Sequence, residues 1–270
     1  TIAHEKSLLA AAVPEAGRIW LEPAWSEVLR VEAARWQAPI FPLPGLEETG
    51  IQVRDTEPLA WRLDHPRWGT LCLPLVAPHE VALALGAAEI AAAQGVEPES
   101  LRARLAVLQR PTGRLGVHRY GALTLLDDSY NASPLSMEAA LRTLSLWPRA
   151  RRRVAVLGTM NELGAEAESL HRALGAHAAR LQLDALACVG RGGGWIADAA
   201  RSAGGVAQAF PDAESAATAL AATLHVGDVV LLKASRGERL DRLIEPLARA
   251  ATQLSERATQ DAPRRAVGGA

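Results

Sequence analysis

From about residue 122 onward, short apolar runs alternate with longer segments in which apolar residues recur at helical spacing. The apolar runs predict strands over 122–127, 153–157, 185–189, 206–210 and 229–233. The spaced segments predict helices over 134–147, 165–181, 195–203, 213–224 and 239–254. Continuous apolar strands that alternate with amphipathic helices are typical of a parallel sheet covered on both faces. The pattern therefore predicts a doubly wound α/β domain.

The pattern is less regular in the first part of the chain. Apolar spacing predicts helices over 2–12, 78–94 and 98–108, and short strands over 18–21 and 38–42. Between residues 50 and 75, alternating stretches predict antiparallel strands or hairpins. The turn at 110–113 (Arg-Pro-Thr-Gly) is the expected boundary. We expect one domain over 1–110, a Rossmann-like domain over 111–256, and a disordered tail over 257–270.

Composition narrows the class of protein. The chain has 270 residues, of which 49% are hydrophobic, and its formal net charge is −1. A nucleic-acid-binding protein normally has a basic excess, so no nucleic-acid partner is expected. No apolar run reaches the roughly 18 residues of a membrane span, and no signal peptide opens the chain, so membrane insertion is not expected. Two cysteines make no disulfide framework, and the cytoplasm is the expected compartment.

Lysine is rare in this chain. Lys6 and Lys233 are its two lysines, and the other 27 of its 29 basic residues are arginines. A coding bias toward arginine explains the surface cations. It does not explain positions where an amine must react or act as a compact charge, because arginine cannot replace lysine there. Both lysines are therefore candidate functional residues.

Polar side chains follow three of the predicted strands. Residues 127–134 (Asp-Asp-Ser-Tyr-Asn-Ala-Ser-Pro) end one strand just before a helix. They could simply cap that helix, or an acid there could bind a ribose hydroxyl while its neighbours line a cleft. Lys233 and Arg236 bracket Ser235 at the end of another strand, as an anion clamp would require. Because the carboxyl ends of parallel strands meet at one edge, these groups are expected together, with the loop at 158–164.

Several common motifs are missing. The glycine-rich segment 190–195 lacks the G-x-G-x-x-G spacing, since Trp195 stands where the third glycine belongs, and it is interpreted as a loose turn. The sequence contains no G-x-x-x-x-G-K-[ST] phosphate loop, no G-x-S-x-G elbow and no H-x-x-x-H metal spacing.

Five stretches, in order along the chain, resemble motifs of the Mur ligases. They are 2–6 (I-A-H-E-K), 111–115 (P-T-G-R-L), 127–134 (D-D-S-Y-N-A-S-P), 155–164 (A-V-L-G-T-M-N-E-L-G) and 232–237 (L-K-A-S-R-G). Ser133, Thr159 and Ala234 depart from the family pattern, which has Asn, Asp and Gly there. The resemblance is strongest to the members that join D-alanyl-D-alanine to UDP-N-acetylmuramoyl-tripeptide. It implies that residues 1–110 are the remainder of a central ATPase domain.

The resemblance implies an ATP- and Mg²⁺-dependent ligase of peptidoglycan precursor synthesis, active as a monomer, that forms an amide through an acyl phosphate. It implies catalytic roles for Lys6, Lys233 and Arg236, with Lys6 binding Mg²⁺ as a carbamate. It implies nucleotide contacts from His79, Arg114, Asp127 and Asp128. It implies contacts with the tripeptide or dipeptide substrate from Tyr130, Asn131, Glu162 and Ser235.

The resemblance is incomplete in the first part of the chain. The phosphate loop and the UDP-binding domain of the family would lie upstream of Thr1, so we expect the chain to be a fragment that is inactive alone. Glu80 and Leu83 stand where the adenine-contacting helix of the family carries Asn. Two alternatives stay open. One is a related amide ligase, such as another Mur enzyme or a folylpolyglutamate synthase, and the other is a non-catalytic module that binds a nucleotide or a partner.

Overall fold

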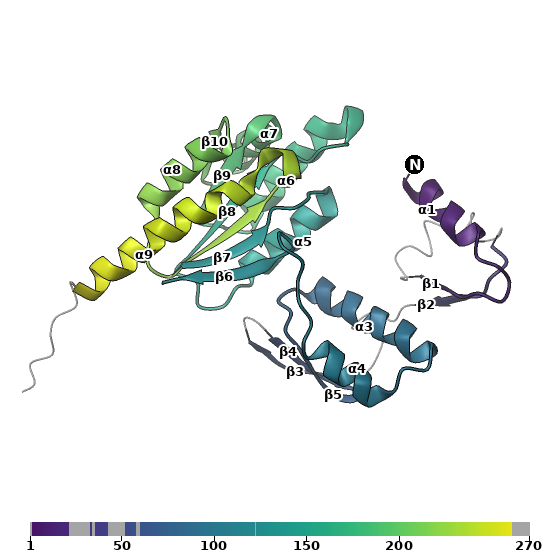
Figure 1. Ribbon diagram of the computed structural model, residues 1–270. Coiled ribbons are helices and arrows are strands. Elements are labelled where there is room, and N and C mark those ends of the chain that lie inside the picture. The colour runs from purple at the N-terminus through teal and green to yellow at the C-terminus, as the bar shows by residue number, and fades with distance from the viewer. Residues whose placement is uncertain are drawn as a thin grey trace, which may run out of the picture. The chain divides into compact units, whose positions relative to one another are not determined.

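The computed structural model describes residues 2–21, 33, 36–42, 52–57, 60–121 and 123–260 (Figure 1). The side chains of 2–6, 42 and 52–57 lie outside this description. The chain divides into two units, Thr1–Gln109 (unit 1) and Arg110–Ala270 (unit 2). Each unit has a hydrophobic core of its own.

A six-stranded sheet forms the centre of unit 2. Its strands are β6 (Gly116–Tyr120), β7 (Leu123–Asp128), β8 (Arg152–Gly158), β9 (Ala185–Val189), β10 (Ala207–Phe210) and β11 (Asp228–Lys233). The order across the sheet is β10-β9-β8-β11-β7-β6. The five strands from β7 to β11 are parallel and confirm the predicted strands. At one edge the sheet has a further strand, β6, which the sequence did not predict and which pairs antiparallel with β7.

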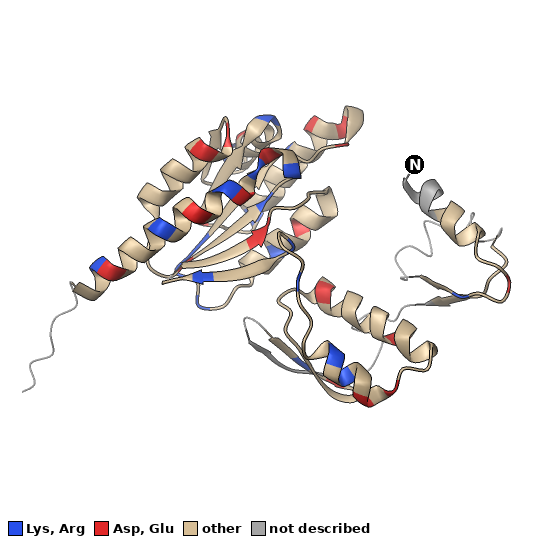
Figure 2. Cartoon of the chain, viewed as in Figure 1, with Lys and Arg blue, Asp and Glu red and all other residues tan. Residues whose placement is uncertain are grey.

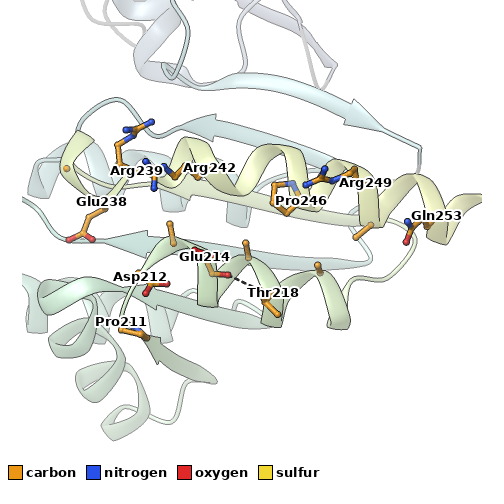
Figure 3. A pocket seen from close by; sticks show the side chains of 15 residues that line it. Pro211, Asp212, Glu214, Thr218, Glu238, Arg239, Arg242, Pro246, Arg249 and Gln253 are labelled. Atoms are coloured by element: carbon orange, nitrogen blue, oxygen red, sulfur yellow. Dashed lines mark hydrogen bonds between the residues drawn. The ribbon is translucent and has the colours of Figure 1, made fainter.

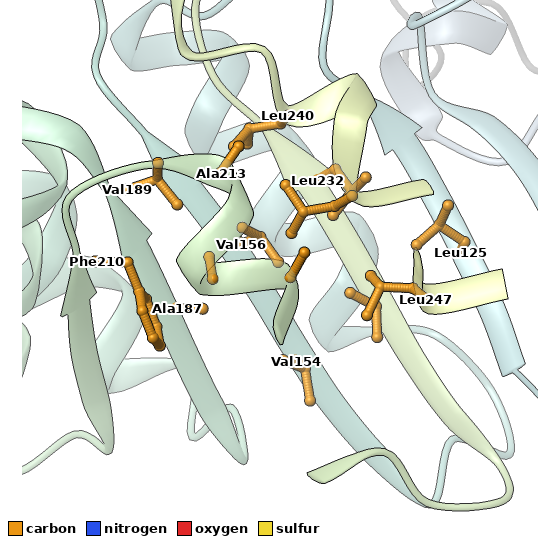
Figure 4. Close-up of a cluster of buried hydrophobic side chains, with 14 of the residues drawn as sticks. Leu125, Val154, Val156, Ala187, Val189, Phe210, Ala213, Leu232, Leu240 and Leu247 are labelled. Carbon is orange, nitrogen blue, oxygen red and sulfur yellow. The ribbon is translucent and has the colours of Figure 1, made fainter. Parts of the chain in front are cut away.

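Helices cover both faces of this sheet. They are α5 (Pro134–Ser145), α6 (Ala167–Arg180), α7 (Gly190–Ser202), α8 (Ala213–Thr223) and α9 (Ile244–Gln260). The helices α5, α6 and α7 pack side by side, and α8 packs against α9. Alternate strand residues, such as Leu125, Val156 and Leu232, form one core with α8 and α9 (Figure 4). The doubly wound α/β architecture is confirmed.

The glycine-rich segment after β9 was wrongly interpreted as a loose turn. Helix α7 begins at Gly190, so the glycines form its first turns. The absence of side chains there allows close packing, because a Cβ at Gly192 would collide with His171 and one at Gly193 with the backbone of Cys188. Spacing alone does not reveal this packing.

The last predicted helix also differs from the structure. Residues Arg236–Glu238 and Leu240–Leu243 form two short 3₁₀ turns, joined at Arg239 in the left-handed region (φ 52°). The α-helix α9 follows and continues to Gln260. The predicted disordered tail was therefore wrong for residues 257–260, and its remainder lies outside the described residues.

Unit 1 contains two small sheets. One is a parallel pair of strands, β1 (Ile19–Leu21) and β2 (Ile40–Pro42), and helix α1 (Ile2–Ala11) precedes β1 in the chain. An antiparallel meander is formed by β3 (Gln52–Glu57), β4 (Ala60–His65) and β5 (Gly69–Leu73). Helices α3 (Pro78–Ala93) and α4 (Pro98–Leu105) share a core with β4 and β5, in which Trp68 and Leu71 are buried. These elements confirm the helices and strands predicted for this region.

Charged side chains of both signs are interspersed over the helices, most clearly along α9 (Figure 2). Within the described ranges, no helix has the combination of length and apolar character that crossing a membrane requires.

Candidate functional site

The candidate site lies where β7, β11 and β8 end. Strand register places Lys233 directly between Asp128 on β7 and Leu157 on β8. The chain leaves β7 and β8 toward α5 and α6, and leaves β11 toward α9, which belongs to the other layer of helices. Ligands of open α/β sheets bind at such a divergence, outside the carboxyl ends of the strands.

An ion pair joins the end of β11 to the end of β7. The Nζ of Lys233 donates to Asp128 Oδ2 at 2.6 Å and to the carbonyl oxygen of Asn131 at 3.1 Å. The Lys233 side chain is 3% exposed and that of Asp128 is 15% exposed. Asp128 also accepts a hydrogen bond from the backbone N–H of Leu115. A desolvated ammonium needs such partners, so this pair fixes the geometry of the edge.

Two arginines contact the ring of Tyr130. The guanidinium carbon of Arg114 lies 4.5 Å from the ring centroid, and that of Arg236 lies 5.5 Å from it. Tyr130 is 44% exposed, and both arginines are exposed as well. Cation–π contact positions the two guanidinium groups without neutralising them. Among the described residues neither has a carboxylate partner, so this rim is suited to an anionic ligand.

Much of the polar stretch after β7 serves local structure. Asp127 is 2% exposed, and its Oδ1 accepts from the N–H and the hydroxyl of Ser129, the latter at 2.6 Å. The hydroxyl of Ser136 bonds to the backbone of Ser133 at the start of α5. The side-chain oxygen of Asn131 accepts from the next backbone N–H. Capping thus accounts for Ser133, whereas Ser129 bonds to Asp127, and the ribose contacts of Asp127 and Asp128 stay predictions.

The loop after β8 is bonded to the loop after β11. Ser235 donates its N–H to the carbonyl oxygen of Thr159 at 3.0 Å, and its hydroxyl accepts from the N–H of Asn161 at 2.9 Å. Ser235 is 3% exposed. Glu162 lies on the same loop, exposed and in the left-handed region (φ 64°). Sequence reasoning thus grouped residues that the structure holds together.

Two predicted residues belong to unit 1. Lys6 lies in α1, and its side chain is outside the described residues, so its predicted role stays untested. His79 is exposed in the first turn of α3. Glu80 has a structural task, since its carboxylate accepts from the N–H groups of Val76 and Ala77 and caps that helix.

The residue most clearly missed from the sequence is His171. It is fully buried in α6 and binds the backbone of Met160, in the loop after β8. A lone histidine on a helix gives no signal of such a contact, because the contact depends on how the loop folds back onto the helix.

A cavity of about 930 Å³ lies elsewhere, between α8 and α9 (Figure 3). Arg239, Arg242 and Arg249 line one side, and acidic residues such as Asp212 and Glu214 line the other. It is lined by none of the predicted site residues that the structure describes. Within the described part of the chain, no group of three His, Cys, Asp or Glu side chains could hold a metal ion.

Comparisons with known proteins agree with this geometry. Residues 113–236 match the family described as Mur ligase, glutamate ligase domain. The UDP-N-acetylmuramoyl-tripeptide–D-alanyl-D-alanine ligase of Synechocystis is 36% identical over 179 residues, which are 66% of this chain and 39% of the relative. The ligase of the same name from Mycobacterium bovis is 32% identical over 91% of this chain and 54% of its own length. The chain thus spans about half the length of such relatives, or less.

Solved structures give the same result. A crystal structure of MurF from Acinetobacter baumannii superposes with a TM-score of 0.75 at 26% identity, covering 92% of this chain and 55% of that one. Residues 113–236 therefore match the C-terminal domain of the Mur ligases, and the chain resembles MurF ligases across both of its units.

Proposed function

We propose that this chain is part of an ATP-dependent amide ligase that adds D-alanyl-D-alanine to UDP-N-acetylmuramoyl-tripeptide in the cytoplasm. The observation that carries the proposal is the cluster at one sheet edge, where Lys233 is buried against Asp128 while Arg114 and Arg236 flank Tyr130. The names of the relatives support the choice of this reaction over other amide ligations.

The proposed reaction has two steps. The substrate carboxylate attacks the γ-phosphorus of ATP, which releases ADP and gives an acyl phosphate. The amine of D-alanyl-D-alanine then attacks the carbonyl carbon and loses a proton, and inorganic phosphate leaves as the amide forms. Negative charge on the transferred oxygens must be stabilised throughout, and cationic side chains supply that stabilisation.

The residues of unit 2 fit parts of this task. The exposed guanidinium groups of Arg114 and Arg236 can each donate two parallel hydrogen bonds to a phosphate or carboxylate. Lys233 bonds to Asp128 and to the carbonyl oxygen of Asn131, and so holds the loop that presents Tyr130 and Asn131. In this proposal Arg114 contacts the nucleotide, and Arg236 contacts the carboxylate of the dipeptide or the acyl phosphate. Glu162 and Ser235 border the same edge, with Ser235 as a support for Arg236.

Magnesium binding in this proposal depends on Lys6. The described carboxylates form no three-membered group for a metal, and Asp128 is already bound to Lys233. In the proposal Lys6, once carbamylated, supplies an oxygen ligand that arginine could not become. His79, at the first turn of α3, is proposed near the nucleotide base.

The test is binding, because the chain alone is expected to form no amide. Isothermal titration with ADP, with and without Mg²⁺, should show binding by the 270-residue chain. Arg114→Gln should weaken the binding of ADP, and Arg236→Gln the binding of D-alanyl-D-alanine, each about tenfold or more, since a hydrogen bond from a charged group contributes about 1.5–3 kcal/mol. The control Arg249→Gln removes an exposed arginine that pairs with Glu245 on α9 and should change nothing.

A second titration identifies the acceptor. We expect D-alanyl-D-alanine to bind in preference to D-glutamate and diaminopimelate. Preference for another amino acid would favour a related ligase, and a folded chain that binds neither nucleotide nor acceptor would favour a non-catalytic module. Amide formation by the chain alone would contradict the expectation that it is inactive, and size-exclusion chromatography would test the proposed monomer.

A further inference from the structure

His171 uses both of its ring nitrogens, although it is fully buried in α6. Its Nε2 accepts a hydrogen bond from the N–H of Met160 at 2.8 Å. A backbone N–H can only donate, so Nε2 carries no proton. The proton is therefore on Nδ1, which donates to the carbonyl oxygen of Ala167 at 2.5 Å. The imidazole is neutral and held in a single tautomer.

The ring of His171 is closely packed on several sides. Gly192 passes so close that a Cβ there would collide with both the ring and the backbone of Thr159. The N–H of Gly192 donates to the hydroxyl of Thr159 at 3.1 Å. The ring of Trp195 lies 5.6 Å away, tilted by 60°. His171 thus lies at the junction of α6, the first turns of α7 and the loop after β8.

The loop after β8 holds Ser235 through two hydrogen bonds. Met160, which His171 binds, stands between the two residues that bond to Ser235, with Thr159 accepting from its N–H and Asn161 donating to its hydroxyl. Ser235 in turn stands directly before Arg236. A path of hydrogen bonds and two short covalent segments, 159–161 and 235–236, therefore connects the buried imidazole to an exposed guanidinium of the candidate site.

A second contact holds the other end of the same turn. The side chain of Glu238 lies against Gly158 and Gly190: a Cβ on Gly190 would collide with its carboxylate, and a Cβ on Gly158 would lie 3.0 Å from its Cγ. The N–H of Glu238 donates to the carbonyl oxygen of Ser235 at 3.0 Å. Arg236 is thus carried on a 3₁₀ turn that is fixed at both ends, one of them through the loop that His171 binds.

We propose that His171 is a positioning residue for the anion-binding loop at 233–237. It acts by fixing residues 159–161, and through them the backbone that carries Ser235 and Arg236. It touches no ligand itself. The effect on loop order is independent of the ligase proposal, whereas the effect on ligand affinity rests on the proposed function.

Two substitutions separate the hydrogen bond from the volume of the ring. His171→Phe keeps an aromatic ring but removes the acceptor for Met160 N–H, and His171→Gln restores an acceptor through its amide oxygen. Leu186→Ala is the control, because Leu186 is 4% exposed and lies on the same sheet near the opposite ends of the strands. It weakens unit 2 without touching the loop.

Hydrogen exchange of the 270-residue chain, resolved by mass spectrometry, is the measurement. In His171→Phe, peptides covering 159–163 and 234–238 should exchange about tenfold faster, as expected for the loss of one buried hydrogen bond. His171→Gln should return both peptides to near their native exchange rates. Leu186→Ala should not accelerate exchange of these two peptides more than it accelerates exchange of other peptides in unit 2. Titration with D-alanyl-D-alanine should show weaker binding by His171→Phe, in the same direction as the effect of Arg236→Gln.

The outcomes are distinguishable. Faster exchange at 159–163 with native exchange at 234–238 would overturn the proposal, as would equal effects of His171→Phe and Leu186→Ala. Faster exchange at both loops in a chain that binds no nucleotide would keep His171 as a positioning residue and reject the proposed function. If His171→Phe does not fold, Ser235→Ala tests the same path by removing the acceptor for Asn161 N–H, and native exchange at 159–163 in that variant would overturn the proposal.

Discussion

The two units differ in how they place their candidate residues. In unit 2, strand pairing sets Lys233 beside Asp128, and hydrogen bonds between loops then fix Ser235. In unit 1, His79 is on an exposed helical turn, and no pairing within the described part of that unit brings it to a partner of matching chemistry. A site built on parallel strands is therefore defined by the backbone, whereas a site built on helix ends depends on what those helices face.

The largest expected losses of stability come from substitutions in the two hydrophobic cores. These substitutions also test whether the two units unfold separately. Trp68 in unit 1 is 1% exposed and stacks on His65, while Leu141 in unit 2 is 0% exposed. Trp68→Ala should cost about 3–5 kcal/mol of unfolding free energy, and Leu141→Ala about 2–5 kcal/mol. Hydrogen exchange in increasing denaturant should assign each loss to its own unit.

The control for these core variants is Leu146→Ala, since Leu146 is 65% exposed and its truncation should change stability by no more than about 0.5 kcal/mol. If either core variant accelerated exchange equally in both units, the units would form a single cooperative body and the comparison would fail.

The next largest effect concerns the ion pair that defines the site in unit 2. Asp128→Asn leaves the ammonium of Lys233, whose side chain is 3% exposed, without its carboxylate. Removing one partner of a buried pair is strongly destabilising, and because Asp128 is partly exposed we expect about 2–3 kcal/mol. Chemical denaturation monitored by circular dichroism measures the loss.

Glu168→Gln provides the comparison for that ion pair. It removes the partner of Arg172 in a pair whose side chains are 52% and 46% exposed, and such surface pairs contribute less than about 1 kcal/mol. Equal losses of unfolding free energy in Asp128→Asn and Glu168→Gln would show that burial does not make the Lys233–Asp128 pair more important for stability than an exposed pair.

The sequence predicted unit 2 well because its strands are buried on both faces and are therefore almost continuously apolar. It missed β6, whose residues at 116–120 are mostly half-buried and mix polar with apolar side chains. It grouped Asp128 with Lys233 correctly, because carboxyl ends of parallel strands share an edge. It could not find His171, because nothing local distinguishes a histidine that binds a distant loop from one that merely fills a core.

A smaller effect, the response to pH between 7.5 and 5.5, should come from unit 1, because the carboxyls of Asp212 and Asp241 in unit 2 have lowered pKa values and titrate below this range. Burial lowers the pKa of His65 below its usual 6.5, and Arg67 acts in the same direction while Glu89 opposes them. The unfolded chain then binds a proton at a higher pH than the folded one. Stability that is fully present above pH 6.5 is therefore lost as the pH falls from 6.5 through the lower folded value.

Denaturation of the native chain and of His65→Phe at pH 7.5 and pH 5.5 measures this response. The aromatic replacement keeps the stacking on Trp68, which has a centroid distance of 3.9 Å, and removes the titration. Its pH dependence should be flatter than that of the native chain. An unchanged slope would assign the loss at low pH to other groups.

The mildest test is chemical labelling of the two cysteines, one of which lies in each unit. Cys72 is exposed on β5, whereas burial raises the pKa of the Cys188 thiol to about 12. At pH 8 only about one in ten thousand such thiols would be ionised, and the group is also shielded, so a thiol reagent should label Cys72 rapidly and Cys188 only when unit 2 opens. Leu141→Ala should therefore accelerate the labelling of Cys188, and Trp68→Ala should not. Rapid labelling of Cys188 in the native chain would mean that unit 2 opens readily, and the contrast drawn here between a backbone-defined site and a helix-end site would lose its basis.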